Sequence, residues 1–238
     1  MNIKKCAVQA LIYLTVVSVF LGGTWLGSEA VTVISQEIPV ERSHTIIVDA
    51  GHGGEDGGAV SCTGVKESEI NLRIALKLND LLHLLGHRTR MIRTTDISVY
   101  TAGNTLAQKK VSDLRERVRI VGETESPILV SIHQNTYPNA RYSGPQMFYN
   151  GAGDSAALAE TIQESFRTSL SPGTHRAVKR AEGIYLMENA PCPAVLAECG
   201  FLSNPAEEAR LRDEGYQRKV CAVIACALGN FLDGQTND

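Results

Sequence analysis

The stretch Ile46-Ile47-Val48-Asp49-Ala50-Gly51-His52-Gly53-Gly54 decides the fold of this chain. Its first part, with Thr45 before it, is a short apolar run, which is typical of a strand buried on both faces. Asp49 and a cluster of glycines close the run. In open α/β sheets, ligands bind outside the carboxyl ends of such strands. We therefore expect functional side chains in the glycine-rich turn.

An amphipathic helix is expected to follow this turn. From Glu67 onward the apolar residues recur with a period of 3.6, and Gly86 gives a stop signal. The residues on the apolar side are Ile70, Ile74, Leu78, Leu81, Leu82 and Leu85. A buried strand followed by a helix of this kind indicates the start of a β-α unit.

The same alternation continues along the chain. Further strands are expected at residues 88–92, 127–132, 146–149, 183–187 and 194–197, and helices at residues 114–121, 154–170, from 205 and at 216–232. Asp154 and Asn204 are the expected helix caps, and residues 96–113 are expected to form a long loop. Apolar strands that alternate with helices predict one α/β domain. We expect a twisted, largely parallel sheet with helices on both faces and an active site at the carboxyl ends of the strands.

The N-terminal segment is expected to direct export. Two lysines precede an uncharged, strongly apolar run at residues 6–27, which is long enough to cross a ~30 Å hydrocarbon layer. We expect residues 1–30 to be a signal peptide or an N-terminal membrane anchor, with cleavage and retention both open. Residues 31–43 would be a linker, and residues 44–236 an exported catalytic domain.

Composition excludes several classes of protein. Of the 238 residues, 43% are hydrophobic and 21% charged, as in ordinary globular proteins rather than disordered chains. A formal net charge of −3 and only 5% aromatic residues argue against nucleic acid as a partner. Contact with a membrane is expected only through the N-terminal segment. The cysteines are expected to be small buried hydrophobes, with a Cys192–Cys199 bridge as the alternative.

Three of the apolar strands run into an ionisable residue. His52 follows the first strand, His133 follows residues 127–132, and Glu198 follows residues 194–197. Parallel strands bring their carboxyl ends to one edge of the sheet, so these side chains should converge. Glu198 interrupts an apolar run, and burial of a carboxylate is costly unless a cation or hydrogen-bond donors accept it.

These residue types suit a catalytic zinc site. Such a site takes three nitrogen or oxygen ligands and leaves one position open. His52, His133 and either Glu55 or Glu67 can supply the ligands, while Glu198 remains free to transfer protons. The alternatives are that the histidines are ordinary loop residues and that Glu67 only complements the helix dipole. The glycine loop lacks the Gly-Lys-Ser/Thr ending of a phosphate-binding loop.

The motifs together resemble the zinc-dependent N-acetylmuramoyl-L-alanine amidases of the Amidase_3 type, over residues 44–232. The motifs are Ile47–Gly54, Val65–Glu69, Arg93–Asp96, Leu114–Arg117, Ser131–Asn135 and Ala194–Pro205. The resemblance implies that His52, Glu67 and His133 are the zinc ligands and that Glu198 is the catalytic glutamate. It also implies hydrolysis of the amide between the lactyl group of N-acetylmuramic acid and L-alanine in peptidoglycan. Ala50, Gln134 and Cys199 depart from the usual family pattern without removing a ligand.

Within the family, the chain is most similar to the sporulation-specific CwlD type, through Tyr142–Tyr149 and Arg176–Met187. That similarity implies action on spore cortex peptidoglycan before muramic-δ-lactam formation, at the developing spore envelope, and leaves room for an unidentified accessory protein. Arg117 and the basic stretch at residues 175–180 are candidates for contacts with substrate carboxylates. For Arg117, the alternative is an ion pair with Asp96 or Glu116. The rival functions are a non-catalytic peptidoglycan-binding protein and a zinc amidase or peptidase that acts on another amide.

Overall fold

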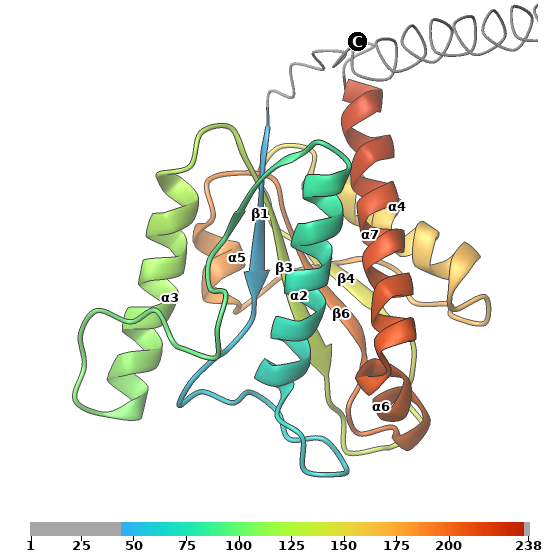
Figure 1. Ribbon diagram of the computed structural model, residues 1–238, viewed down its shortest axis with the longest axis horizontal. Helices are drawn as coiled ribbons and strands as arrows, with labels where there is room; N and C mark the ends of the chain where they lie inside the picture. Colours follow the sequence, from blue (N-terminus) through green and yellow to red (C-terminus); the bar gives the residue numbers. More distant parts are fainter. Residues whose placement is uncertain (1–43, 236–238) are drawn as a thin grey trace, which may run out of the picture. The chain divides into compact units, whose positions relative to one another are not determined.

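A six-stranded sheet forms the centre of the fold (Figure 1). The structure, a computed structural model, describes residues 44–235; the expected export segment and linker lie outside these residues. The strands are β1 (Thr45–Ala50), β2 (Arg88–Met91), β3 (Pro127–Asn135), β4 (Gln146–Tyr149), β5 (Lys179–Arg180) and β6 (Ala194–Phe201). Their order across the sheet is β2-β1-β3-β6-β4-β5, so β2 and β5 are the edge strands.

The sheet is largely parallel, as expected. β1 pairs in parallel with β2 and β3, and β3 pairs in parallel with β6. β4 runs antiparallel to β6, with Gln146 opposite Glu198, and β5 runs parallel to β4. The carboxyl ends of β1, β3 and β6 therefore meet at one edge of the sheet, where β4 begins.

Helices cover both faces of the sheet. They are α2 (Glu67–Leu84), α3 (Leu106–Gly122), α4 (Ser155–Ser169), α5 (Tyr185–Asn189), α6 (Pro205–Arg212) and α7 (Glu214–Gln235). Figure 1 shows α3 and α5 on one side of β1, with α2, α4 and α7 on the other. Within residues 44–235, none of the helices has the length and apolar character needed to cross a membrane.

Strand alternation divides the core between the two faces. Ile46 and Val48 of β1 join the large cluster formed with α2, α4 and α7, whereas Ile47 joins the smaller cluster near α3 and α5. Since side chains alternate along a strand, Asp49 lies on the same face as Ile47. Ser131 and His133 of β3 have the same parity as Leu129, which also belongs to the smaller cluster. Asp49, Ser131 and His133 therefore lie on the face of the sheet that α3 and α5 cover.

Several expected elements differ from the structure. Residues 183–187 do not form a strand: Gly183 has a φ of 73°, and a short helix begins at Tyr185. The expected loop at residues 96–113 ends early, because Thr105 and Gln108 form a capping box that starts α3 at Leu106. Asp154 makes no side-chain capping hydrogen bond, whereas Asn204 caps α6 as expected.

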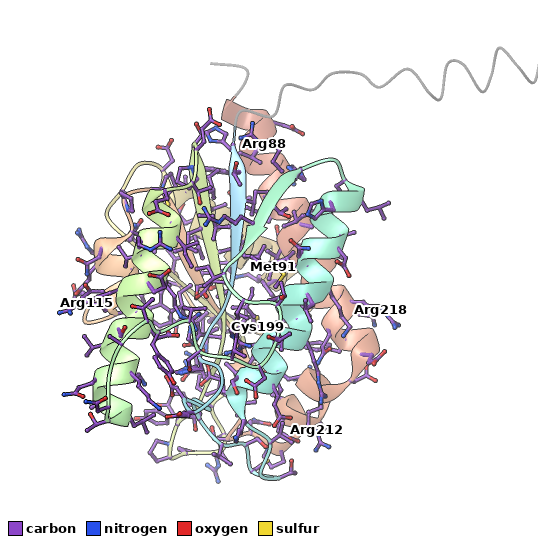
Figure 2. All side chains as sticks on the ribbon, turned by 60° about the vertical axis from the view of Figure 1, so that its left-hand side comes forward. Arg88, Met91, Arg115, Cys199, Arg212 and Arg218 are labelled. Atoms are coloured by element: carbon purple, nitrogen blue, oxygen red, sulfur yellow. The ribbon has the colours of Figure 1, made fainter. Side chains whose placement is uncertain are left out.

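The cysteines of the described region are free. Cys192, Cys199 and Cys221 are buried, while Cys62 and Cys226 are exposed, so the alternative of a Cys192–Cys199 bridge is wrong. Figure 2 shows Cys199 in the interior, in contrast to surface side chains such as Arg115 and Arg218. The buried thiols pack as small hydrophobic groups, and burial raises the pKa of Cys192 to about 11.

Candidate active site

Three residues that are distant in sequence form one cluster of metal-binding side chains. His52 lies in the turn after β1, Glu67 is the first residue of α2, and His133 lies on β3. One nitrogen or oxygen atom from each lies within 4.8 Å of the others. His52 Nε2 is 3.3 Å from Glu67 Oε2, and His133 Nδ1 is 2.9 Å from Glu67 Oε1. The donor set of two imidazoles and one carboxylate is one that zinc prefers.

Glycines make room for this cluster. A Cβ added at Gly51 would lie 2.1 Å from His133 Nε2, which is far inside any permitted contact. At Gly58, where φ is +67°, a Cβ would lie 2.6 Å from Glu67 Oε2. The glycine-rich turn is therefore required for the two histidines and Glu67 to approach one another.

Hydrogen bonds hold the carboxylate of Glu67 in place. Its Oε1 accepts from Asn71 Nδ2 at 3.1 Å and from the backbone N–H of Gln134 at 3.1 Å, and its Oε2 accepts from the N–H of Ala59 at 3.0 Å. Burial raises the pKa of Glu67, but hydrogen bonds with His133 and His52 outweigh burial and hold the pKa well below its usual range. The group is therefore a carboxylate, as a metal ligand must be.

His52 is oriented by a second carboxylate. Its Nδ1 is 3.0 Å from Asp56 Oδ2, and Lys110 Nζ lies 3.2 Å from the same oxygen. Burial lowers the pKa of His52, but the hydrogen bonds with Asp56 and Glu67 outweigh it and raise the pKa to about 9. The carboxylates thus favour positive charge at this position, whether a proton or a metal ion supplies it. A carboxylate behind a histidine is also the usual way to orient a metal ligand.

Arg117 secures the turn that carries His52. The guanidinium donates to Asp49, to Asp113 Oδ2 at 2.6 Å, and to the carbonyl oxygens of Ala50 and His52 at 3.1 and 2.8 Å. His52 has a φ of 62°, a left-handed conformation that is unfavourable for this residue. The ion-pair partners are Asp49 and Asp113 in place of the expected Asp96 or Glu116. The side chain of Arg117 is only 2% exposed. Its expected contact with a substrate carboxylate stays a prediction.

Glu198 lies on β6, inside the strand rather than after its end, and directly opposite His133 of β3. Its Oε2 atom is buried and has no hydrogen-bond partner in the described part of the chain. Burial raises the pKa of Glu198 to about 7. An unpartnered carboxylate with a pKa near neutrality can both accept and return a proton.

A cavity of about 230 Å³ opens beside these residues. Its lining includes His52, His133 and Asp56, together with Lys110 of α3 and Tyr185 of α5. The rings of His52 and His133 are edge to face, with centroids 5.0 Å apart. The cavity therefore gives a small polar group access to the cluster.

The structure separates the two carboxylates between which spacing alone could not choose. Glu55 is exposed, and its Oε1 lies 2.6 Å from Lys109 Nζ, so it is not part of the cluster that contains Glu67. Sequence reasoning did not identify Asn71 or Asp56. A signal existed for Asn71, because it is four residues after Glu67 on one helix face, whereas Asp56 lies in the turn, where a spacing of four residues carries no such signal.

Comparisons with known proteins identify a family and relatives for this chain. A family model described as N-acetylmuramoyl-L-alanine amidase (Amidase_3) matches residues 46–230. The germination-specific N-acetylmuramoyl-L-alanine amidase of Bacillus subtilis is 39% identical over 181 residues, covering 75% of this chain and 76% of that protein. The amidase LytC of the same organism is 31% identical over 184 residues, covering 76% of this chain and 34% of that protein.

A solved structure shows the same fold. The CwlD amidase from Clostridioides difficile, determined in complex with the GerS lipoprotein, is 38% identical, with a TM-score of 0.76. The match covers 79% of this chain and 98% of that chain. An N-acetylmuramoyl-L-alanine amidase from Clostridium difficile 630 is 28% identical, with a TM-score of 0.70, and the match covers 81% of this chain and 98% of the other.

Proposed function

Because this chain belongs to the Amidase_3 family of N-acetylmuramoyl-L-alanine amidases, we propose that it is a zinc-dependent member that acts on the peptidoglycan of the spore cortex. The bond cleaved is the amide between the lactyl group of N-acetylmuramic acid and L-alanine. The observation that carries the proposal is the unpartnered carboxylate of Glu198 opposite His133, beside three metal-binding side chains.

His52, Glu67 and His133 would hold the zinc ion. The fit is supported by the convergence of their ligand atoms and by the ionised state of Glu67. When bound, zinc would act as a Lewis acid that makes water a better nucleophile and polarises the substrate carbonyl. Asn71, Gln134 and Asp56 keep the ligands oriented, so little reorganisation is needed when substrate binds.

Glu198 would move the proton. Its carboxylate accepts a proton from the attacking water and returns that proton to the amine of L-alanine as this group leaves. A pKa near 7 suits both steps, because the group gives up and takes back a proton at neutral pH with little cost.

The biological setting is proposed from the relatives. One relative is named germination-specific, and the CwlD neighbour is in complex with a lipoprotein. We propose that this chain is exported through residues 1–30, that it acts at the developing spore envelope, and that it has an accessory protein of its own. The substrate lies outside the cytoplasm, which requires such export.

The test is digestion of purified spore cortex peptidoglycan with residues 44–238 or the full chain. We expect new L-alanine amino termini, with about one zinc per chain by metal analysis. His52→Ala and His133→Ala should each lower both the zinc content and amino-terminus release, whereas Glu55→Ala, outside the cluster, should leave both unchanged.

Three outcomes would contradict the proposal. Wild-type zinc content in both histidine variants would remove the metal assignment. Binding of peptidoglycan without release of any amine would favour a non-catalytic binding protein, and release of an amine other than that of L-alanine would favour an amidase or peptidase with another substrate.

A further inference from the structure

A basic side chain lies on an aromatic surface at the same edge of the sheet as Glu198. The guanidinium of Arg176 is 4.6 Å from the ring centre of Phe201 and 5.8 Å from that of Tyr142. The ring of Tyr137 packs on Tyr142, with centroids 4.4 Å apart. We call Arg176, Phe201, Tyr142 and Tyr137 the Arg176 platform. Tyr137 and Tyr142 are 48% and 44% exposed, so the platform faces solvent.

Strand register connects the Arg176 platform to Glu198. Phe201 is three residues beyond Glu198 on β6, and a β-bulge lies between them, because His133 pairs with Glu198 but Asn135 pairs with Phe201. Three residues of a strand span about 10 Å. On the other side of Glu198, Gln146 of β4 is its direct partner, and Arg176 Nη1 donates to Gln146 Oε1 at 2.9 Å.

The carboxylate that lines the same cavity as Arg176, that of Glu207, is already engaged by Arg210 and by the N–H groups of Gly144 and Phe201. Arg176 Nε donates to the carbonyl oxygen of Ser143 at 2.9 Å, so both described hydrogen bonds of its guanidinium go to neutral acceptors. In the described part of the chain no carboxylate forms an ion pair with Arg176, in contrast to Arg117 with its two aspartates. Arg176 is thus a half-buried, oriented cation with donor capacity left, a state that favours binding of a carboxylate.

We propose that Arg176 binds a carboxylate of the peptide stem, on the residue that follows L-alanine. The inference rests on the proposed amidase function. The first two residues of an extended peptide stem span about 7 Å. The arginine side chain and the side chain that carries the carboxylate are long enough to cover the remainder of the ~10 Å between Glu198 and Phe201. Tyr142 and Tyr137 would flank the bound stem, and the ring of Phe201 lies against the guanidinium.

The test compares two probes that differ in one group. N-acetylmuramoyl-L-alanyl-D-glutamate carries a free α-carboxylate, and N-acetylmuramoyl-L-alanyl-D-isoglutamine carries an amide in its place. We expect the wild-type enzyme to prefer the acid by about 10-fold in kcat/KM, the usual effect of one charge-assisted hydrogen bond. Arg176→Gln should abolish the preference, mainly through KM, and Arg176→Lys should keep part of it.

The matched control is Arg88→Gln. Arg88 lies at the amino end of β2 and is far from Cys199, which follows Glu198 on β6 (Figure 2). The same loss of charge at Arg88 should therefore leave the preference for the acid probe intact. Melting temperatures show whether each variant is folded. If Arg176→Gln unfolds, two other variants test the same contact. They are Arg176→Lys and Tyr142→Leu, the second of which removes an aromatic ring beside the guanidinium. Hydrolysis of both probes by the wild type with equal kcat/KM would overturn the inference.

Binding distinguishes this inference from the proposed function. The two probes are titrated calorimetrically into the Glu198→Gln variant, which keeps Arg176. If Glu198→Gln binds the acid more tightly than the amide, and Glu198→Gln/Arg176→Gln does not, the role of Arg176 is supported. This support holds even if the wild type hydrolyses neither probe, because a lack of hydrolysis would refute only the amidase proposal. Equal affinities refute the inference even if hydrolysis is fast.

Discussion

Glu198 is the residue on which turnover should depend most. Glu198→Gln keeps the size of the side chain and one acceptor oxygen but cannot exchange a proton. General acid–base groups contribute roughly 10²–10⁴-fold, so L-alanine release should fall by at least about 100-fold. Zinc content, measured on the same samples, should stay at the wild-type level. Near-full hydrolysis would make Glu198 structural, and loss of the metal would make it a ligand.

The same residue predicts a dependence of stability on pH in the chelated protein. The folded-state pKa of Glu198 is about 7, above the ordinary value of 4.5, so its ionisation weakens folding. The penalty is absent below about pH 4.5, grows as pH rises, and is fully present above about pH 7. At pH 8 the free energy of unfolding of Glu198→Gln should therefore exceed that of the wild type by up to roughly 3 kcal/mol.

The comparison uses urea unfolding in EDTA at pH 8 and pH 4.5. Other titrating groups are common to both proteins, so the difference between them isolates Glu198. The gain from Glu198→Gln should nearly vanish at pH 4.5. A gain that is equal at both pH values would show that it does not come from a buried charge.

The sequence could predict those residues whose surroundings are mostly local. Glu198 could be identified because a carboxylate inside an apolar run needs a special reason. The partners of Arg117 could not be predicted, because Asp49 lies 68 positions away and only the parallel pairing of the strands brings it close. Likewise, spacing alone left Glu55 and Glu67 equivalent, and only the path of the glycine-rich loop places Glu67 against both histidines.

At the scale of elements, the turn between β1 and α2 depends on its glycines. Gly51→Ala would place a methyl group 2.1 Å from His133 Nε2, so the imidazole must leave its present position beside Glu67. We expect lower zinc content and lower activity, with a loss of about 1–3 kcal/mol in the free energy of unfolding from overpacking. Metal analysis and urea unfolding measure the two effects.

Gly229→Ala in α7 is the control for this substitution. Nothing lies within 4 Å of a Cβ at this position, and alanine favours a helix over glycine by about 0.5–1 kcal/mol. It should therefore stabilise the fold slightly and leave zinc binding unchanged. The turn interpretation fails if Gly51→Ala binds zinc as the wild type does.

Elements with a strong local signal were predictable, and those set by tertiary context were not. The helix from Glu67 and the apolar strands β1 and β3 follow from periodicity and apolar runs. Residues 183–187 are as apolar as a strand, yet β6 already has β3 and β4 as neighbours, and the segment closes over the site as α5 instead. The antiparallel direction of β4 likewise depends on pairing that no local pattern encodes.

At the scale of the whole molecule, Arg117 joins the sheet to α3. Burial raises the pKa of Asp49, but the charge of Arg117, the hydrogen bond from Ser131 and the charge of His133 together outweigh burial and lower the pKa. Arg117→Gln would leave Asp49 and Asp113 without their cation, and loss of one partner of a buried ion pair costs about 3–5 kcal/mol. Arg119→Gln removes an exposed arginine two residues further on the same helix and should leave stability unchanged.

Acid should reduce the difference between these proteins. The stabilisation of Asp49 is fully present above its ordinary pKa of 3.8 and is lost as pH falls from that value through the lowered folded-state pKa, because the wild type then takes up a proton at Asp49 when it unfolds. Urea unfolding at pH 7 and pH 3 measures the change. Equal stabilities of Arg117→Gln and Arg119→Gln at pH 7 would contradict this role of Arg117.

The two edge strands have a consequence for the behaviour of the protein at high concentration. An open sheet exposes unpaired N–H and C=O groups at its edges, which are templates for aggregation with another chain. Here β2 has only four residues and carries Arg88 and Arg90, while β5 is the dipeptide Lys179–Arg180. Short, cationic edges repel their counterparts on a second molecule. The fold therefore carries its own protection against fibril formation, in a chain that is expected to fold outside the cytoplasm.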